Sequence, residues 1–217
     1  MKRHLRHWLL TSTVVLAGCS AVQRPPIQTV PHVDLPRFMG DWYVIANIPT
    51  FVETDAYNAV ESYRLDADGT IATTFTFRQG SYDGAPKCHR PRGFVLDTQS
   101  NAVWGMQFIW PFKGDFRIVY LNSDYTHTVV GRQKRDHVWI MARQPAMPEP
   151  IYQSILELLA REGYDTRLIQ RVPQRWEPEA RRPLTTEPPR DHARRWRTGR
   201  RVGGLAQAWV GSARAGA

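Results

Sequence analysis

The sequence FMGDWYVIANI occupies residues 38–48 and decides the fold prediction. In this stretch Gly40 stands two residues before Trp42, at the start of an alternating apolar run. Glycine has no side chain, so it allows a tight entry turn and leaves space for an indole. We therefore predict that residues 42–48 form the first strand of a sheet, with Trp42 pointing inward.

Two later stretches stand at compatible distances from this one. A Ser-Asp-Tyr sequence lies between two strand-like runs, and an arginine ends the last run. Taken in order, these stretches resemble the three signature regions of the lipocalin family, and the resemblance covers about residues 35–173. In lipocalins the matching arginine packs across the indole at the closed end of a β-barrel, a contact of roughly 0.5–2 kcal/mol. The resemblance thus implies a structural role for Gly40, Trp42, Ser123, Asp124, Tyr125 and Arg143.

Strand-like runs recur at short intervals along the middle of the chain, with turn residues between them. They cover residues 42–48, 58–65, 70–77, 93–97, 102–110, 116–121, 125–132 and 137–143, and residues 79–86 are expected to form a loop. An antiparallel meander of eight strands can close into a barrel without bare edges. Asp68-Gly69 is the clearest hairpin turn.

The spacing of apolar residues changes from alternation to a helical repeat once, between Pro148 and Gly163. There Ile151, Ile155 and Leu159 recur at helical spacing, which predicts one amphipathic helix. A short strand over residues 165–172 is expected to follow. The predicted fold is all-β: an eight-stranded antiparallel up-and-down (lipocalin) β-barrel with one C-terminal α-helix packed on its outside.

Alternation along the strands predicts which side chains point inward. With Trp42 inside, Asn47 should face outward. An eight-stranded barrel is about wide enough either to be filled by side chains or to hold one small ligand. The lipocalin resemblance implies the second case, with no cofactor. The predicted cavity wall consists of Val44, Ala46, Phe75, Phe77, Trp104, Met106, Phe108, Phe116, Ile118, Tyr120, His127, Trp139 and Met141.

Two polar side chains have alternative interpretations. Glu61 either pairs with a ligand head group or, with the register shifted by one residue, faces solvent. His127 either hydrogen-bonds a carboxylate or phosphate head or has a structural role. Neither has a partner at metal-ligand spacing, so no metal site is predicted.

The net charge of +9 is concentrated at the two ends of the chain. Residues 1–18 carry +3 and residues 175–217 carry +6, which leaves residues 19–174 neutral. A neutral core disfavours nucleic acid as a partner.

The chain begins with a basic segment and a short apolar run that ends in Leu16-Ala17-Gly18-Cys19. The apolar run is too short to span a bilayer, and it indicates a secretory signal. The small residues before Cys19 resemble a bacterial lipoprotein signal, in which the cysteine is lipidated and becomes the mature N-terminus. Ser20 then favours export to the outer membrane of a Gram-negative envelope, on its periplasmic face. The alternative is an ordinary cleaved signal with a coincidental cysteine.

Four segments are therefore predicted. They are a lipoprotein signal peptide (1–18), a Pro-rich tether from lipidated Cys19 (19–34), the barrel (35–173) and a basic, disordered tail (174–217). The tail either contacts anionic head groups or has no function. If Cys19 is lipidated, Cys88 has no partner and a disulfide framework is excluded.

The sequence and its resemblance predict a membrane-anchored lipid-binding protein that stores or transports fatty acids or lysophospholipids for membrane maintenance. A hydrophobic small molecule and the membrane are its expected partners, and a homodimer is left open. One alternative is an enzyme on the same scaffold, although the chain has no Gly-x-Ser-x-Gly or His-Glu-x-x-His motif. Another is a structural lipoprotein with a packed barrel.

Overall fold

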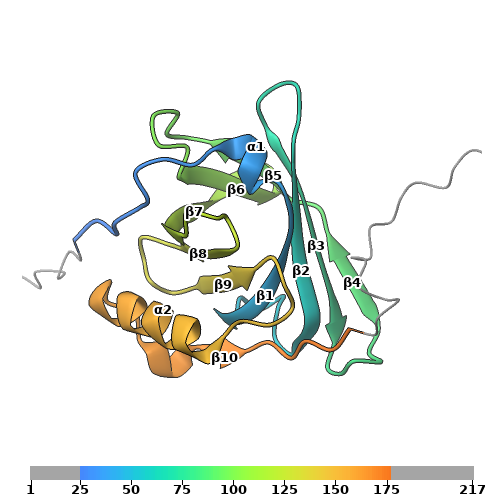
Figure 1. Cartoon of the computed structure of the whole chain (residues 1–217). Helices are drawn as coiled ribbons and strands as arrows, with labels where there is room; N and C mark the ends of the chain where they lie inside the picture. Colours follow the sequence, from blue (N-terminus) through green and yellow to red (C-terminus); the bar gives the residue numbers. More distant parts are fainter. Residues whose placement is uncertain (1–24, 177–217) are drawn as a thin grey trace, which may run out of the picture. The chain divides into compact units, whose positions relative to one another are not determined.

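Eight antiparallel strand positions close into a barrel in the computed structural model, which describes residues 25–176 (Figure 1). Closure comes from β1, which pairs with both β2 and β9. The fourth position is shared by β4 and β5, both of which pair with β3. The predicted fold class is confirmed. The strands are β1 (Gly40–Ile48), β2 (Ala56–Leu65), β3 (Ile71–Gln79), β4 (Pro86–His89), β5 (Arg92–Val95), β6 (Val103–Ile109), β7 (Phe112–Leu121), β8 (His127–Gly131), β9 (Val138–Ala142) and β10 (Gln170–Arg171).

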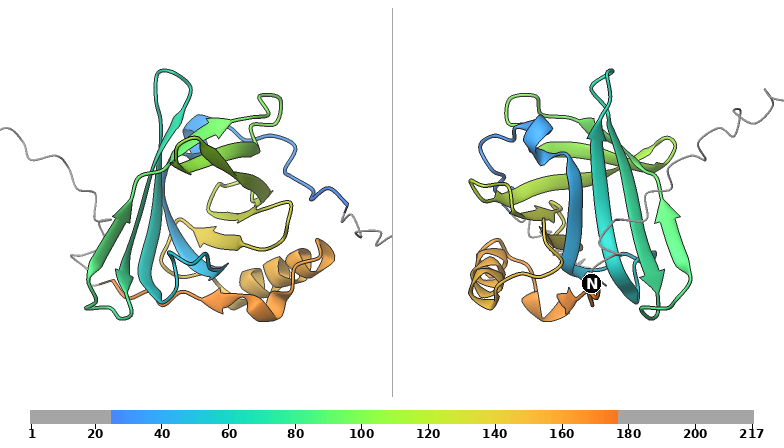
Figure 2. Two further views of the ribbon diagram at one scale, coloured as in Figure 1. Left: turned by 180° about the vertical axis from the view of Figure 1, so that it is seen from behind. Right: turned by 45° about the vertical axis from the view of Figure 1, so that its right-hand side comes forward.

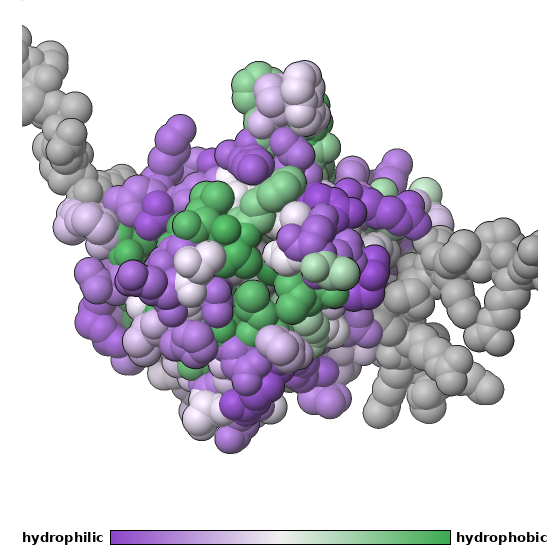
Figure 3. Space-filling model, turned by 90° about the horizontal axis from the view of Figure 1, so that it is seen from above, coloured by the Kyte–Doolittle hydropathy of each residue, from purple (hydrophilic) through white to green (hydrophobic). Residues whose placement is uncertain are grey.

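A one-turn helix, α1 (Leu35–Phe38), closes one end of the barrel. The Asp34 side chain caps it by accepting a hydrogen bond from the Arg37 amide at 3.2 Å, as Asp commonly does at helix starts. Phe38 is fully buried against Trp42. Seen from the side on which α1 lies, hydrophilic side chains surround a central group of apolar ones (Figure 3).

The segment before α1 lies against the barrel instead of extending away from it. Ile27 and Val33 are buried, and the amides of Val30 and Val33 donate to the carbonyls of Ile118 and Ser100. The predicted tether over residues 19–34 is therefore wrong for residues 25–34, which belong to the folded unit. Residues 1–24, including Cys19, lie outside the described residues.

Helix α2 (Glu149–Arg161) packs on the outside of the barrel, as predicted, on the side away from β4 (Figure 2). Its buried residues Tyr152, Ile155 and Leu159 join an outer hydrophobic cluster with side chains of β1, β8 and β9. Within residues 25–176, no helix is long and apolar enough to cross a membrane.

The predicted strand over residues 165–172 instead contains the 3-10 helix η1 (Thr166–Leu168), and only β10 pairs as a strand. The Asp165 side chain accepts from the Arg167 amide, which favours the helical turn. The chain after β10 still contacts the barrel, because Gln174 donates to the carbonyls of Val44 and Ala59. The predicted tail thus begins too early, and residues 177–217 are not described.

Two β-bulges change which side chains face inward. The register between β1 and β9 shifts between Val44 and Ala46, and the register between β7 and β8 shifts between Ile118 and Tyr120. A bulge adds one residue and reverses the alternation beyond it. Ala46 and Tyr120 therefore join the outer cluster instead of the predicted inner wall.

His127 was also assigned to the inner wall incorrectly. It pairs with Ala142 of the outer cluster, whereas its neighbour Thr128 pairs with Met141 of the inner cluster. Cross-strand partners share one face of a sheet, so His127 points outward.

Candidate functional site

The barrel interior is solid next to α1. Phe38, Tyr63, Trp104 and Phe116 pack there around Trp42. The rings of Trp104 and Phe116 stack at 5.0 Å between centroids, and Phe38 meets Trp104 edge-on at 5.5 Å. Because these aromatic rings fill this end, a ligand cannot occupy it.

Arg143 seals the same end. Its guanidinium carbon lies 3.8 Å from the centroid of the Trp42 ring. Its nitrogens donate to the carbonyls of Asp41, Phe38 and Met39 at 2.8–2.9 Å. Burial lowers the pKa of Arg143 to about 10, so the side chain stays charged at neutral pH.

The Ser-Asp-Tyr sequence lies beside this seal. The Tyr125 hydroxyl accepts from the Asp34 amide at 2.9 Å, and the Ser123 carbonyl accepts from Arg37 at 3.1 Å. Asp124 accepts a long hydrogen bond from the Ser123 hydroxyl. The contacts of Tyr125 and Ser123 hold α1 against the barrel end, and none of the three motif residues lines the cavity described below.

Gly40 lies where the chain enters β1. Its φ of +94° is a conformation that residues with a side chain rarely adopt. A Cβ added to Gly40 would also lie 3.3 Å from a guanidinium nitrogen of Arg143.

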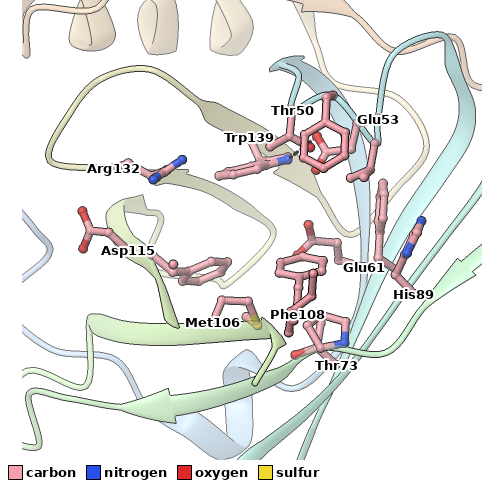
Figure 4. A pocket seen from close by; sticks show the side chains of 17 residues that line it. Thr50, Glu53, Glu61, Thr73, His89, Met106, Phe108, Asp115, Arg132 and Trp139 are labelled. Atoms are coloured by element: carbon pink, nitrogen blue, oxygen red, sulfur yellow. Dashed lines mark hydrogen bonds between the residues drawn. The ribbon is translucent and has the colours of Figure 1, made fainter. Parts of the chain in front are cut away.

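A cavity of about 520 Å³ lies in the barrel interior (Figure 4). Five predicted wall residues line it: Phe75, Met106, Phe108, Phe116 and Trp139. The others on the inner side belong to the inner cluster without lining the cavity: Val44, Phe77, Trp104, Ile118 and Met141. Phe108 is 55% exposed and Phe51 is 93% exposed, so the opening lies near these two residues.

The sequence did not predict the cavity-lining residues that lie outside the predicted strands. Residues 50–53, after β1, fold across the cavity, and β4 brings His89 against the rings of Phe75 and Phe77. β4 was missed because its segment was assigned in part to a loop. The lining residues outside the predicted wall are Thr50, Phe51, Val52, Glu53, Thr73, His89, Pro91, Ile109, Gly114, Asp115 and Arg132, together with Glu61, for which the sequence left two registers open.

Two glutamates are the buried acids of this cavity. Glu61 on β2 faces the cavity centre, which decides the register that the sequence left open. It accepts a hydrogen bond from the Tyr63 hydroxyl. Burial, and secondarily the charge of Glu53, raise the pKa of Glu61 to about 7.

Glu53 reaches the cavity from the segment after β1. Its carboxylate accepts from the Trp139 indole at 2.9 Å and from the Asn47 side chain at 3.2 Å. Asn47 points inward, contrary to prediction, because it follows the bulge in β1. Burial raises the pKa of Glu53 as well.

The remaining candidates lie away from the cavity. His127 contacts the Thr126 hydroxyl, and burial lowers its pKa. Cys88 is an exposed residue of β4, opposite Thr76, and forms no disulfide within the described residues. Among residues 25–176, no group of His, Cys, Asp or Glu side chains could hold a metal ion.

The family model for the lipocalin-like domain matches residues 33–174. The chain belongs to the lipocalin family. This lipocalin is 28% identical over 165 residues to temperature-induced lipocalin-1 of Arabidopsis thaliana, covering 70% of this chain and 85% of that protein. It is 26% identical over 168 residues to the outer membrane lipoprotein Blc of Citrobacter freundii, covering 76% of this chain and 93% of the relative.

Solved structures support the lipocalin fold. Insecticyanin from the tobacco hornworm Manduca sexta matches with a TM-score of 0.57 and 13% identity, covering 72% of this lipocalin and 87% of insecticyanin. Apocrustacyanin C2 matches with a TM-score of 0.53 and 11% identity, covering 65% and 80% of the two chains. At these identities the similarity concerns the fold alone.

Proposed function

We propose that this lipocalin binds one fatty acid or lysophospholipid in its cavity and stores or transports it for membrane maintenance. The observation that carries the proposal is the cavity of about 520 Å³, closed by aromatic rings at one end and lined by Phe75, Met106 and Trp139. Apolar surface that moves from water into such a site gains about 25 cal/mol per Å². An acyl chain with several hundred Å² of surface can therefore bind without any chemical step, even after the costs of association.

Binding can be tested by titrating the purified protein with a fluorescent fatty acid. We expect saturable binding at one site per chain, displaced by lysophospholipids. Phe108→Asp should weaken binding at least tenfold, because it places a negative charge at the opening, which repels a carboxylate or phosphate head group. Phe112→Asp is the matched control, since Phe112 lies close in sequence, is 75% exposed and does not line the cavity. Absence of saturable binding by any amphiphile would overturn the proposal.

We also propose that lipidated Cys19 anchors this lipocalin in the outer membrane. The sequence before Cys19 and the similarity to the Blc relatives, which are outer membrane lipoproteins, support this location. Several acyl chains together, at about 0.8 kcal/mol per buried methylene, give a durable anchor.

Replacement of the anchor residue tests this location. In a Gram-negative host, Cys19→Ser should prevent incorporation of radioactive palmitate and move the protein from the outer-membrane fraction to the soluble periplasm. Cys88→Ser should change neither result. Equal palmitate labelling of the Cys19→Ser variant and the native protein would contradict the anchor.

A further inference from the structure

We propose that the cavity recognises its amphiphile through a protonated amine, which the carboxylates of Glu53 and Glu61 bind. This inference rests on the proposed function and specifies the head group. Both residues line the cavity, and their side chains come from different elements (Figure 4). They are 4% and 8% exposed, so they are held in the interior and do not form a surface acidic patch.

The protein supplies only neutral donors to these two acids. Tyr63 donates to Glu61, and Trp139 and Asn47 donate to Glu53. Within residues 25–176, no lysine, arginine or histidine forms an ion pair with either carboxylate. An unpaired charge away from water is costly, so a buried carboxylate either takes up a proton or pairs with a cation. A cationic group on the ligand would complete this site.

Two other charged groups that face the cavity form ion pairs. Asp115 on β7 forms an ion pair with Arg117 at 2.9 Å and accepts from the Gln133 amide at 2.6 Å. Arg132, after β8, has a guanidinium nitrogen 3.4 Å from Asp136, although its buried Nε has no hydrogen-bond partner within the described residues. His89 on β4 stacks against phenylalanine rings. Glu53 and Glu61 are therefore the cavity carboxylates that have no ion-pair partner among residues 25–176.

This charge discriminates between ligand head groups. A fatty-acid carboxylate placed near Glu53 and Glu61 would add a third acid, so either the ligand or a glutamate must take up a proton. A protonated amine would instead be attracted and could donate up to three hydrogen bonds. Primary ammonium groups occur on long-chain amines and on ethanolamine phospholipids, and both present the same chemistry.

The inference also predicts the pH dependence of binding. The pKa of Glu61 is raised to about 7, and an amine binds the ionised form. The affinity of the protein for the amine should therefore rise by about tenfold between pH 6 and pH 8, while the amine itself remains protonated. Tyr63, Glu53, His89, Asp115 and Arg132 are the titratable groups around it. Laurate should show the opposite trend.

Ligands that share one chain length separate the effect of the head group on affinity from the effect of the acyl chain. We would titrate the purified protein with dodecylamine, dodecanol and laurate, each below its aggregation concentration, using calorimetry. At pH 8 dodecylamine should bind at least tenfold more tightly than laurate, with dodecanol between them. Lauroyl lysophosphatidylethanolamine and lysophosphatidylglycerol distinguish the two sources of the amine, because only the first carries an ammonium group. A preference for the ethanolamine lipid identifies a phospholipid head; preference for dodecylamine alone identifies a simple amine.

Variants test the two carboxylates directly. Glu61→Gln and Glu53→Gln keep the side-chain volume and should each reduce the amine-to-laurate ratio at least fivefold. Glu157→Gln, on the exposed face of α2, is the control and should leave the ratio unchanged. If a variant fails to fold, the pH dependence of amine and laurate binding by the native protein still tests the amine site. Laurate binding as tightly as dodecylamine would overturn the amine site while leaving the lipid-binding proposal intact; binding of none of these ligands would overturn both.

Discussion

Replacing Arg143 by methionine will lower the free energy of unfolding by about 3 kcal/mol or more. Methionine keeps much of the side-chain length but removes the guanidinium that lies over Trp42. The carbonyls of Asp41, Phe38 and Met39 would each lose a donor at the sealed end of the barrel. The Phe38 carbonyl keeps the Trp42 indole as a donor, so the main losses are at Asp41 and Met39. A buried polar group that loses its partner costs about 1–3 kcal/mol, so these two carbonyls should contribute more than the ring contact.

Urea unfolding followed by tryptophan fluorescence measures this loss. Arg64→Met is the control, because the Arg64 side chain is 75% exposed and its ion pair with Asp66 lies at the surface. Exposed ion pairs contribute about 0–1 kcal/mol, so this variant should remain close to the native protein. Arg143→Lys should fall between the two, since lysine keeps the charge but not the planar set of donors. Equal midpoints for Arg143→Met and Arg64→Met would show that the seal does not stabilise the fold.

The features of the fold that depend on repeated local patterns were predictable from the sequence. Alternating apolar residues and the turn at Asp68-Gly69 predict strands and a hairpin, and the spacing of Ile151, Ile155 and Leu159 predicts α2. The signature stretches gave the order of the barrel and placed Arg143 beside Trp42. Short elements such as α1 and β4 have too few residues to show a period, so they were missed.

Which side chains of a strand point into the barrel was predictable only as far as the first bulge in that strand. Ala46 and Tyr120 were assigned to the wrong face because one extra residue in β1 and in β7 reverses the alternation. Nothing in the local sequence marks these bulges, since the residues on both sides are apolar. Pairing across the sheet, not propensity within a strand, determines where they occur.

The boundary between filled core and cavity depends on contacts between distant segments. Trp104 and Met106 are both inward-facing residues of β6, yet Trp104 packs in the solid end and Met106 lines the cavity. Their difference arises in part from α1, which places Phe38 against Trp104. Glu53 reaches the cavity through the path of the loop after β1, which no period in the sequence describes.

Between pH 5 and pH 8 this lipocalin should lose stability as the pH rises, and Glu61→Gln should remove most of that loss. The pKa of Glu61 is about 4.5 in the unfolded chain and about 7 in the folded protein. Its neutral form is favoured by folding, so its contribution is fully present below pH 4.5 and disappears as the pH rises to about 7 and above. The difference in pKa corresponds to about 3 kcal/mol, since one unit is worth about 1.4 kcal/mol. Glu53 acts in the same direction because burial raises its pKa too.

Urea unfolding at a series of pH values from 5 to 8 tests whether stability falls as the pH rises and whether Glu61 causes the fall. The Glu61→Gln variant cannot ionise, so its stability should vary less with pH and should exceed that of the native protein at pH 8. Glu157→Gln removes an exposed carboxyl and should follow the native curve. A saturating amine ligand should flatten the native curve between pH 6 and pH 8, because its tenfold gain in affinity over this range offsets the stability that Glu61 loses. A native curve that rises with pH in the absence of ligand would show that Glu61 is ionised and well solvated, and the charge argument for the cavity would then fail.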